Sequence, residues 1–418
     1  MKTIELKGLD AKVYTETLDN GLEVYMIPYD NKKNYFISYA TRFGSDIIGW
    51  KNGEGTYKPP YGIAHFLEHK MFESEDGIDP FTFFSKSGTD SNASTSFDYT
   101  QYICYGTKKF KTNLKYLLKF VNEPYYTDDN VEKEKGIIKE EIEMYQDMPD
   151  FKLEMKLREC IYKNSPRRID IAGSVDDIYK ITKEDLYKCY ENFYRTNNMF
   201  VLIVGNFKKD EALDAIKEEL GNKKRQNLPE VIKIKEPKTV YQKELNIKAN
   251  VEVPKIGFGL KVPTDNLELD DIELDLYLTM LTTILFGSSS IFRQKVRDDK
   301  LLNSIYLEWE SIKGYKTFYL MASSRKPEEL IKRIKDELHD IKIDKKSFER
   351  KKKVWIANEV KMIDSVNATV NNFYDDIIKY KKIIPDKVDL IRKMKIEKLN
   401  DLINKIDFKN ISVVTMEK

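Results

Sequence analysis

The chain has 418 residues, of which 41% are hydrophobic and 33% charged, a composition that excludes an intrinsically disordered protein and is typical of a soluble globular one. Its 71 Lys and Arg residues against 69 Asp and Glu residues leave a net charge of only +2, so no global field attracts nucleic acid or an anionic membrane. The length favours two domains of about 200 residues each.

The N-terminal segment and the cysteines indicate a compartment. The first 21 residues contain no apolar segment after the first lysine, so we expect no signal peptide. The nearest approach to a membrane span, 277–286, is short and is interrupted by threonines. Three widely spaced cysteines, Cys104, Cys160 and Cys189, are typical of free thiols in a reducing compartment. We therefore expect a cytoplasmic protein with neither a membrane nor a nucleic-acid partner.

The first half of the chain alternates between strand-like and helix-like hydrophobic patterns. Strands are predicted over 20–27, 34–42 and 199–204, with a strand pair over 92–106. Helices are predicted over 62–73, 79–87, 111–122, 130–145, 151–163, 183–194 and 211–220. A polar, lysine-rich stretch with two prolines, 221–238, is the best candidate for a linker.

A similar order of elements follows the linker. Strands are predicted over 255–262, 301–309, 317–323 and 411–415, and helices over 267–286, 290–297, 327–341, 346–380 and 388–406. The recurrence indicates an internal duplication, with an N-terminal domain at 1–220 and a C-terminal domain at 239–418. We expect the lone His339 and the basic run 350–353 of the second half to be ordinary solvated residues.

The most informative motif is His65-Phe66-Leu67-Glu68-His69, which lies within the predicted helix 62–73. On a helix, residues four apart share a face, so both imidazoles can bind one zinc ion. Glu68 lies on the same face and can deprotonate a zinc-bound water. This HxxEH order is the inverse of the HExxH order of other zinc peptidases.

A catalytic zinc needs a third protein ligand. The helix around 132–143 offers five carboxylates: Glu132, Glu134, Glu140, Glu141 and Glu143. Glu134 and Glu141, seven residues apart, share one helical face, so one could bind the metal while the other supports it. The spacing alone does not choose among the five.

These motifs resemble the pitrilysin/insulinase metallopeptidases, family M16, and in particular their bacterial YmfH-like and processing-peptidase-like members. The likeness rests on His65-x-x-Glu68-His69 followed by Glu134-x6-Glu141, and it extends over essentially the whole chain. Supporting phrases are 61–64 (YGIA), 71–73 (MFE), 92–95 (NAST), Gly173, and 193–206 with its Val-Gly-Asn ending.

The resemblance implies specific roles for these residues. His65, His69 and Glu141 would bind one zinc ion per chain, Glu68 would be the general base, and Glu134 would be a supporting catalytic carboxylate. Asn92 and Ala93 would lie on the strand to which a peptide substrate adds as a further β-strand. The implied fold is α+β, with two homologous domains, each a mainly antiparallel sheet with helices on one face, as in the LuxS/MPP-like metallohydrolases.

One departure from the family concerns its second half, where an arginine and a tyrosine hold substrate. Arg297 matches the arginine, but Asn303 stands at the tyrosine position. Tyr306 is displaced by three residues, an odd number that places it on the other face of a strand. The family's clamshell has four such domains, so we expect a heterodimer with a homologous subunit that supplies the Arg/Tyr pair. A homodimer is the second possibility.

The sequence therefore predicts a zinc endopeptidase acting on peptides or short unfolded segments inside a chamber. A non-catalytic scaffolding subunit is the main alternative, although the intact motif argues against it. A purely structural zinc site fits less well, because such sites favour four closed, cysteine-rich ligands.

Overall fold

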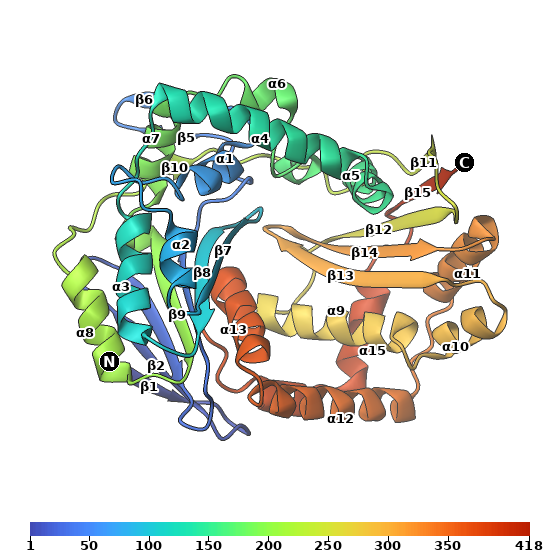
Figure 1. Cartoon of the computed structure of the whole chain (residues 1–418). Coiled ribbons are helices and arrows are strands. Elements are labelled where there is room, and N and C mark those ends of the chain that lie inside the picture. Colours follow the sequence, from blue (N-terminus) through green and yellow to red (C-terminus); the bar gives the residue numbers. More distant parts are fainter. The chain divides into compact units, whose positions relative to one another are not determined.

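The computed structural model describes all 418 residues, which form two compact units (Figure 1). The first unit comprises 1–143, 170–233 and 360–386, and the second comprises 144–169, 234–359 and 387–418. The units are therefore not the contiguous halves 1–220 and 239–418, because each contains a segment from the other half of the chain. The division into two homologous domains along the sequence stays a prediction.

A seven-stranded sheet forms the centre of the first unit. In spatial order its strands are β1 (Lys2–Glu5), β2 (Lys12–Thr17), β3 (Glu23–Pro28), β9 (Met199–Gly205), β4 (Tyr35–Thr41), β8 (Thr100–Gly106) and β7 (Asp90–Thr95). All neighbours are antiparallel except β3 and β9. Since β7 is the last strand in this order, one of its edges is free.

Helices cover both faces of this sheet. The helices that the first half contributes to this unit are α1 (Ile63–Lys70), α2 (Pro80–Ser85), α3 (Phe110–Val121), α4 (Asp128–Gln146), α6 (Val175–Ile178), α7 (Lys183–Phe193) and α8 (Lys209–Leu220). Their apolar residues share one core with inward-facing strand residues such as Ile37 and Tyr102. The opposite face packs against α13 (Val366–Tyr380), which comes from the second half (Figure 1).

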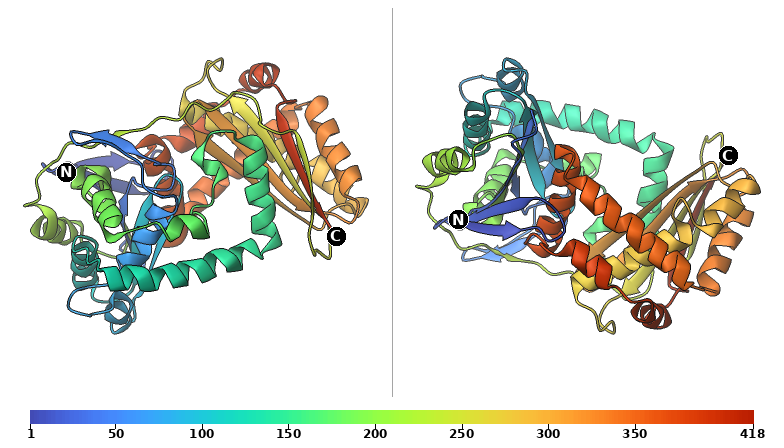
Figure 2. Two further views of the ribbon diagram at one scale, coloured as in Figure 1. Left: turned by 90° about the horizontal axis from the view of Figure 1, so that it is seen from above. Right: turned by 90° about the horizontal axis from the view of Figure 1, so that it is seen from below.

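The second unit has a five-stranded sheet in the order β11 (Glu244–Lys248), β15 (Ile411–Glu417), β12 (Lys255–Pro263), β14 (Tyr315–Ser323) and β13 (Ser304–Ile312). The C-terminal strand β15, red in Figure 2, lies between β11 and β12. The helices of this half are α9 (Asp271–Phe286), α10 (Ile291–Asp298), α11 (Pro327–His339), α12 (Lys345–Met362), α14 (Lys387–Lys393) and α15 (Ile396–Lys405).

The second sheet also receives a helix from the other half of the chain. One of its faces forms a core with helices of the second half. The other face packs against α5 (Pro149–Ile161) through residues such as Leu157 and Ile161. Gly259 of β12 permits this approach, because a Cβ there would lie 2.3 Å from the Ile161 side chain. The α+β class with antiparallel-rich sheets is confirmed. The expectation of helices on only one face of each sheet was wrong, because α13 covers the second face of the first sheet and α5 that of the second.

The predicted linker, 221–238, is anchored at both ends. Its strand β10 (Glu230–Val231) pairs with β5 (Trp50–Asn52), which pairs in turn with β6 (Gly55–Tyr57). Further on, the carboxylate of Glu236 accepts hydrogen bonds from the backbone of Lys163, Asn164 and Ser165. Short 3₁₀ turns occur at η1 (Pro166–Arg168) and η2 (Thr196–Asn198).

Two predicted helices of the second half are each divided in two. The segment 346–380 forms α12 and α13, because Ser365 caps a new helix by accepting a hydrogen bond from the Ala368 N–H. The segment 388–406 forms α14 and α15. In these places the prediction of one continuous helix was wrong.

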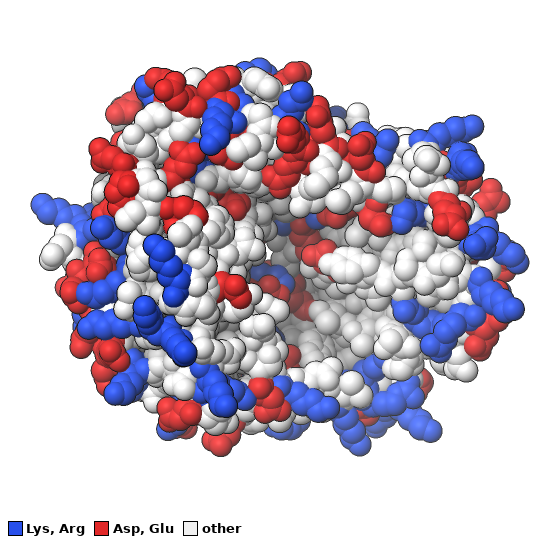
Figure 3. Space-filling view, in the orientation of Figure 1, with Lys and Arg blue, Asp and Glu red and all other residues white.

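The basic run on α12 is only partly solvated. Arg350 and Lys353 are exposed, and Lys and Arg side chains gather along α12 on the face shown in Figure 3. Lys351 and Lys352 are buried instead, and they donate to the Ser289 hydroxyl and the Met394 carbonyl. The prediction of a wholly solvated run was therefore wrong for these two residues.

The segment 271–298 is long and apolar enough to cross a membrane by length and composition. In the structure it comprises two helices, α9 and α10, separated at 287–290, and 56% of its most apolar window is buried. Its leucines belong to the core of the second unit. We therefore interpret it as a core segment.

Candidate active site

Two glycines fix the start of α1, the helix that carries the HxxEH motif. Gly62 has φ +82° and Gly173 has φ +76°, a region that favours glycine. A Cβ on Gly62 would lie 2.2 Å from the Ala172 carbonyl oxygen, and one on Gly173 would lie 2.7 Å from that of Tyr61. The two segments therefore pack backbone to backbone, which sets the position from which His65 and His69 project.

His65, His69 and Glu141 converge at one point in the first unit. Glu141 Oε2 lies 3.7 Å from His65 Nε2 and 3.4 Å from His69 Nε2. The ligand atoms of the three residues all lie within 4.8 Å of one another. Of the five carboxylates on α4 that the sequence left open, Glu141 is the one placed against both imidazoles.

These distances fit a tetrahedral metal. Zinc bonds of about 2.1 Å at tetrahedral angles place neighbouring ligand atoms about 3.4 Å apart. Two imidazole nitrogens and one carboxylate oxygen are a donor set that zinc accepts, and three protein ligands leave a fourth position open, as in catalytic sites. We conclude that the residues present fit a catalytic zinc ion.

The two histidines differ in charge. Burial, and secondarily the neighbouring His69, lowers the pKa of His65 to about 4, so His65 is neutral at pH 7. Burial opposes protonation of His69 as well, but hydrogen bonds to Glu134 and Glu141 outweigh it and raise its pKa to about 9. In the metal-free protein His69 therefore holds a proton that a metal must displace.

Glu134 contacts the ring nitrogen of His69 that does not face Glu141. Its Oε1 lies 3.0 Å from His69 Nδ1, so the Nδ1–H can donate to it and Nε2 is left for the metal. Burial tends to raise the pKa of Glu134, but the contacts with His69 and Lys70 lower it overall. Glu134 is thus an acceptor for the ligand rather than a ligand itself.

Glu68 is buried beside the cluster. Its side chain is bound by Thr95 of β7, whose hydroxyl donates to Oε2 at 2.8 Å. Burial raises the pKa of Glu68. A carboxylate has about four acceptor positions, so Glu68 can still take a further proton while Thr95 holds it.

Asn92 and Ala93 lie on β7, the free edge of the first sheet. At the β7–β8 hairpin the Ser96 N–H donates to the Tyr99 carbonyl oxygen, so Ser96 is a hydrogen-bonded position. Hydrogen-bonded and non-hydrogen-bonded positions alternate along an antiparallel strand. The backbone groups of Ser91, Ala93 and Thr95 therefore point away from β8, toward the free edge. Consistent with this, the Ala93 N–H donates to the side chain of its own neighbour, Asn92. The Ala93 side chain packs inward against the core.

Comparison with known proteins identifies the family. The model described as Insulinase (Peptidase family M16) matches residues 56–174, and the one described as Peptidase M16 inactive domain matches 180–354. A Bacillus subtilis protein named uncharacterized zinc protease YmfH is 36% identical over 384 residues, or 89% of either chain. The chain belongs to peptidase family M16.

Solved structures agree with this assignment. The M16-like peptidase from Alicyclobacillus acidocaldarius is 31% identical and superposes with a TM-score of 0.92 over 99% of this chain and 100% of that one. The structure titled peptidase M16 inactive domain from Pseudomonas fluorescens, at 16% identity, shares the fold with a TM-score of 0.78, covering 97% of this chain and 98% of that one. Both structures therefore share the fold of this chain, although one of the two is described as an inactive domain.

The residues matched to the M16 Arg/Tyr pair lie in the second unit. Arg297 is exposed near the end of α10 and makes no ion pair. Asn303 precedes β13, and its N–H donates to Ser323 O. Tyr306 lies on the same face of β13 as Glu308, to which its hydroxyl donates, whereas Ile305 and Leu307 face the helical core. Tyr306 therefore points to the face opposite that of the neighbouring Ile305.

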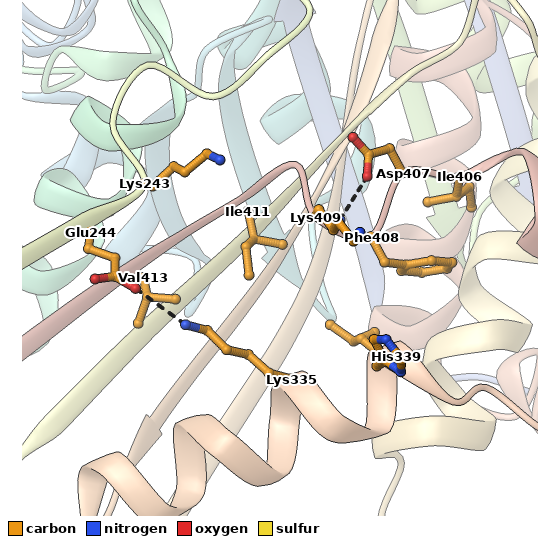
Figure 4. Close-up of a pocket in the computed structure, with 11 residues that line it drawn as sticks. Lys243, Glu244, Lys335, His339, Ile406, Asp407, Phe408, Lys409, Ile411 and Val413 are labelled. Atoms are coloured by element: carbon orange, nitrogen blue, oxygen red, sulfur yellow. Dashed lines mark hydrogen bonds and ion pairs between the residues drawn. The ribbon is translucent and has the colours of Figure 1, made fainter.

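A separate concavity lies in the second unit, between the end of α11 and strands β11 and β15 (Figure 4). His339 lies on its rim, and Lys335 pairs with Glu244 across it at 3.3 Å. It contains a single histidine and no cysteine, so it lacks the ligands for a metal site of the M16 kind. His339 is exposed, in agreement with the sequence-based expectation.

Lys70 and Thr95 are the two residues that the sequence did not single out. Each contacts a residue of the site, Lys70 through Glu134 and Thr95 through Glu68. The only signal for Lys70 in the sequence is its position directly after His69, at the end of the helix that carries the motif. For Thr95, the signal is the two-residue alternation of a strand, which places its side chain on the same face of β7 as that of Ala93.

Proposed function

We propose that this M16 protein is a zinc-dependent endopeptidase, with one zinc ion bound by His65, His69 and Glu141. The observation that carries the proposal is the convergence of these three residues within 4.8 Å beside a buried Glu68. The names of relatives such as YmfH, which include the words zinc protease, support the same metal and reaction.

Glu68 would act as the general base. When bound, zinc supplies a Lewis acid that polarises the scissile carbonyl and acidifies the attacking water. Glu68, held by the Thr95 hydroxyl, takes the proton of that water on its carboxylate and then delivers it to the leaving amine. The raised pKa of Glu68 suits a group that must both accept and return a proton.

The substrate would be a peptide or a short unfolded segment that adds to the free edge of β7. The outward backbone groups of Ala93 and its neighbours offer main-chain hydrogen bonds, which read the extended backbone more than the side chains. The Asn92 side chain would have to release the Ala93 N–H before a substrate could accept from it.

We further propose that the chain works in the cytoplasm as a heterodimer, in which a homologous M16 subunit supplies the Arg/Tyr pair. Arg297 alone is retained here, and Tyr306 is a poor replacement for the missing tyrosine, because an odd displacement along a strand turns a side chain to the opposite face. A homodimer would present Asn303 at every site and would bind the transition state less well.

A scaffolding role is the alternative, because the residues 180–354 match a domain described as inactive and because solved relatives include one so titled. The intact set of His65, Glu68, His69 and Glu141 favours catalysis, since a scaffold needs neither the base nor the ligands. The two functions make opposite predictions for zinc-dependent cleavage.

The proposal is tested by zinc content and cleavage of a quenched peptide library, for the wild type and Glu141→Ala, each alone and mixed with the homologous subunit. We expect one zinc per wild-type chain, loss of tight zinc binding in Glu141→Ala, and cleavage by the wild type that increases on mixing. Zinc binding without cleavage in any pairing would support the scaffold instead. Activity that is full without the second subunit would contradict the heterodimer.

A further inference from the structure

Lys70 is a completely buried lysine next to the proposed metal site. Its side chain has 0% exposure. Its Nζ lies 2.6 Å from Glu73 Oε1, 3.1 Å from the Asn130 carbonyl oxygen and 3.6 Å from Glu134 Oε2. All of its polar contacts are thus with α4, or with the residues that directly follow α1.

A buried ammonium is costly unless it is paired, so its presence in α1 requires a compensating role. The neighbouring residues of α1, such as Leu67 and Phe66, are apolar and fill the core. An apolar side chain at position 70 would pack there without that cost. The charge is compensated by two carboxylates, those of Glu73 and Glu134, and Glu134 is the one that also contacts a proposed metal ligand.

Glu134 links Lys70 to a metal ligand. One of its carboxylate oxygens, Oε1, faces His69 Nδ1 at 3.0 Å, and the other, Oε2, faces Lys70. Three carboxylates, Glu68, Glu134 and Glu141, surround the two imidazoles, and Lys70 is the lysine that forms an ion pair with this group. No arginine does so.

We propose that Lys70 is a positioning residue of the zinc site, which holds Glu134 where it accepts the Nδ1–H of His69 and so strengthens zinc binding without touching the metal. The inference rests on the proposed zinc site and deepens it. With Nδ1–H engaged, His69 presents the Nε2 lone pair to the metal in a fixed orientation. Without the cation, Glu134 loses the partner that fixes its second oxygen, and its orientation toward His69 is relaxed.

The test measures the zinc dissociation constant by competition with a chromogenic chelator, on the full chain, for the wild type, Lys70→Met, Glu134→Gln and the double variant. Partners behind a metal ligand typically change metal affinity by about 10- to 100-fold. We expect a weakening of that size in Glu134→Gln, which loses the direct partner of His69, and a smaller weakening of more than about threefold in Lys70→Met. Because Lys70 acts through Glu134, we expect the double variant to bind zinc no more weakly than Glu134→Gln alone.

A matched control is Lys261→Met. Lys261 is also fully buried and paired with a glutamate, Glu236 at 2.8 Å, but it lies in the second unit. Its loss should lower the thermal unfolding temperature and leave the zinc dissociation constant unchanged. A general effect of losing a buried lysine is thereby separated from an effect on the site.

The outcomes are distinct. Zinc affinity in Lys70→Met within about twofold of the wild type would overturn the proposal, since Lys70 would then have no effect on how Glu134 holds His69. A further loss of affinity in the double variant relative to Glu134→Gln would also overturn it. Should Lys70→Met fail to fold, Lys70→Gln, which keeps a polar side chain at this position, takes its place with the same criterion. A wild type that binds no zinc would instead contradict the proposed zinc site itself.

Discussion

At the scale of single residues, Thr95 orients the proposed base, through its hydroxyl and also through its backbone N–H. Thr95 reaches Glu68 from β7 with a 2.8 Å hydrogen bond to a carboxylate oxygen. Hydrogen bonds to charged groups contribute about 1.5–3 kcal/mol, which corresponds to about 10- to 100-fold in a rate. We therefore predict that Thr95→Val lowers kcat by about that factor, with zinc content and KM unchanged.

Thr95→Ser is the matched control for this prediction, because it retains the hydroxyl and loses only a methyl group. It should keep kcat within a few-fold of the wild type. If Val and Ser lower kcat equally, the methyl group rather than the hydrogen bond is responsible, and Thr95 does not position Glu68.

The charge of His69 predicts how zinc binding depends on pH. In the zinc-free protein its pKa of about 9 exceeds the ordinary value of 6.5, so protonated His69 stabilises the fold at low pH, and this contribution is lost as the pH rises through about 9. Zinc requires the neutral imidazole. Binding should therefore release close to one proton at pH 7.5, and affinity should rise by about tenfold per pH unit up to about pH 9.

Calorimetry in two buffers that differ in ionisation enthalpy measures this proton release directly. His65, with a pKa of about 4, contributes none above pH 6. An observed binding enthalpy that is independent of the buffer would show that His69 is already neutral in the zinc-free protein.

At the scale of elements, the free edge of β7 predicts the effect of a proline. Ala93→Pro removes one outward N–H, and proline is tolerated at such edge positions because the β7–β8 ladder does not use that group. A lost hydrogen bond of about 0.5–1.5 kcal/mol should lower kcat/KM by about 3- to 10-fold. The measurement is steady-state cleavage of a peptide substrate, with zinc content as the control.

An unchanged kcat/KM in a folded Ala93→Pro protein would mean that the substrate does not pair with β7 at this position. A loss of zinc would instead mean that the change had disturbed α1. The two readouts separate substrate binding from damage to the site.

The elements that carry the site could be predicted from the sequence because their signals are local. The helical period over 62–73 and the seven-residue spacing of Glu134 and Glu141 place three ligands and a base on two helices. The contacts of Lys70 and Thr95 could not be predicted in this way, because Lys70 meets residues 60 to 64 positions away and Thr95 meets one 27 positions away. The break at Ser365 was missed because apolar residues continue at helical spacing on both sides of it.

At the scale of the whole molecule, the exchange of helices makes each unit depend on both halves of the chain. The sheet residues Tyr25, Phe200 and Leu202 are buried with α13 residues such as Phe373. Residues 1–220 alone lack α13 and would expose this apolar face. We predict that 1–220 expressed alone aggregates or binds a hydrophobic dye, whereas the whole chain unfolds cooperatively.

Thermal unfolding followed by circular dichroism, together with size-exclusion chromatography, tests this dependence. A soluble, monomeric 1–220 fragment with a cooperative transition close to that of the whole chain would contradict it. Restoration of solubility by co-expressing the remainder of the chain would support it.

The most direct test of the account as a whole is Glu68→Gln, with zinc content and peptide cleavage measured on the same preparation. Glutamine keeps the size of the side chain but cannot accept the water's proton. We predict one zinc per chain in both proteins and a loss of cleavage by about 10²- to 10⁴-fold in the variant. Cleavage by Glu68→Gln at the wild-type rate, with zinc bound, would contradict it.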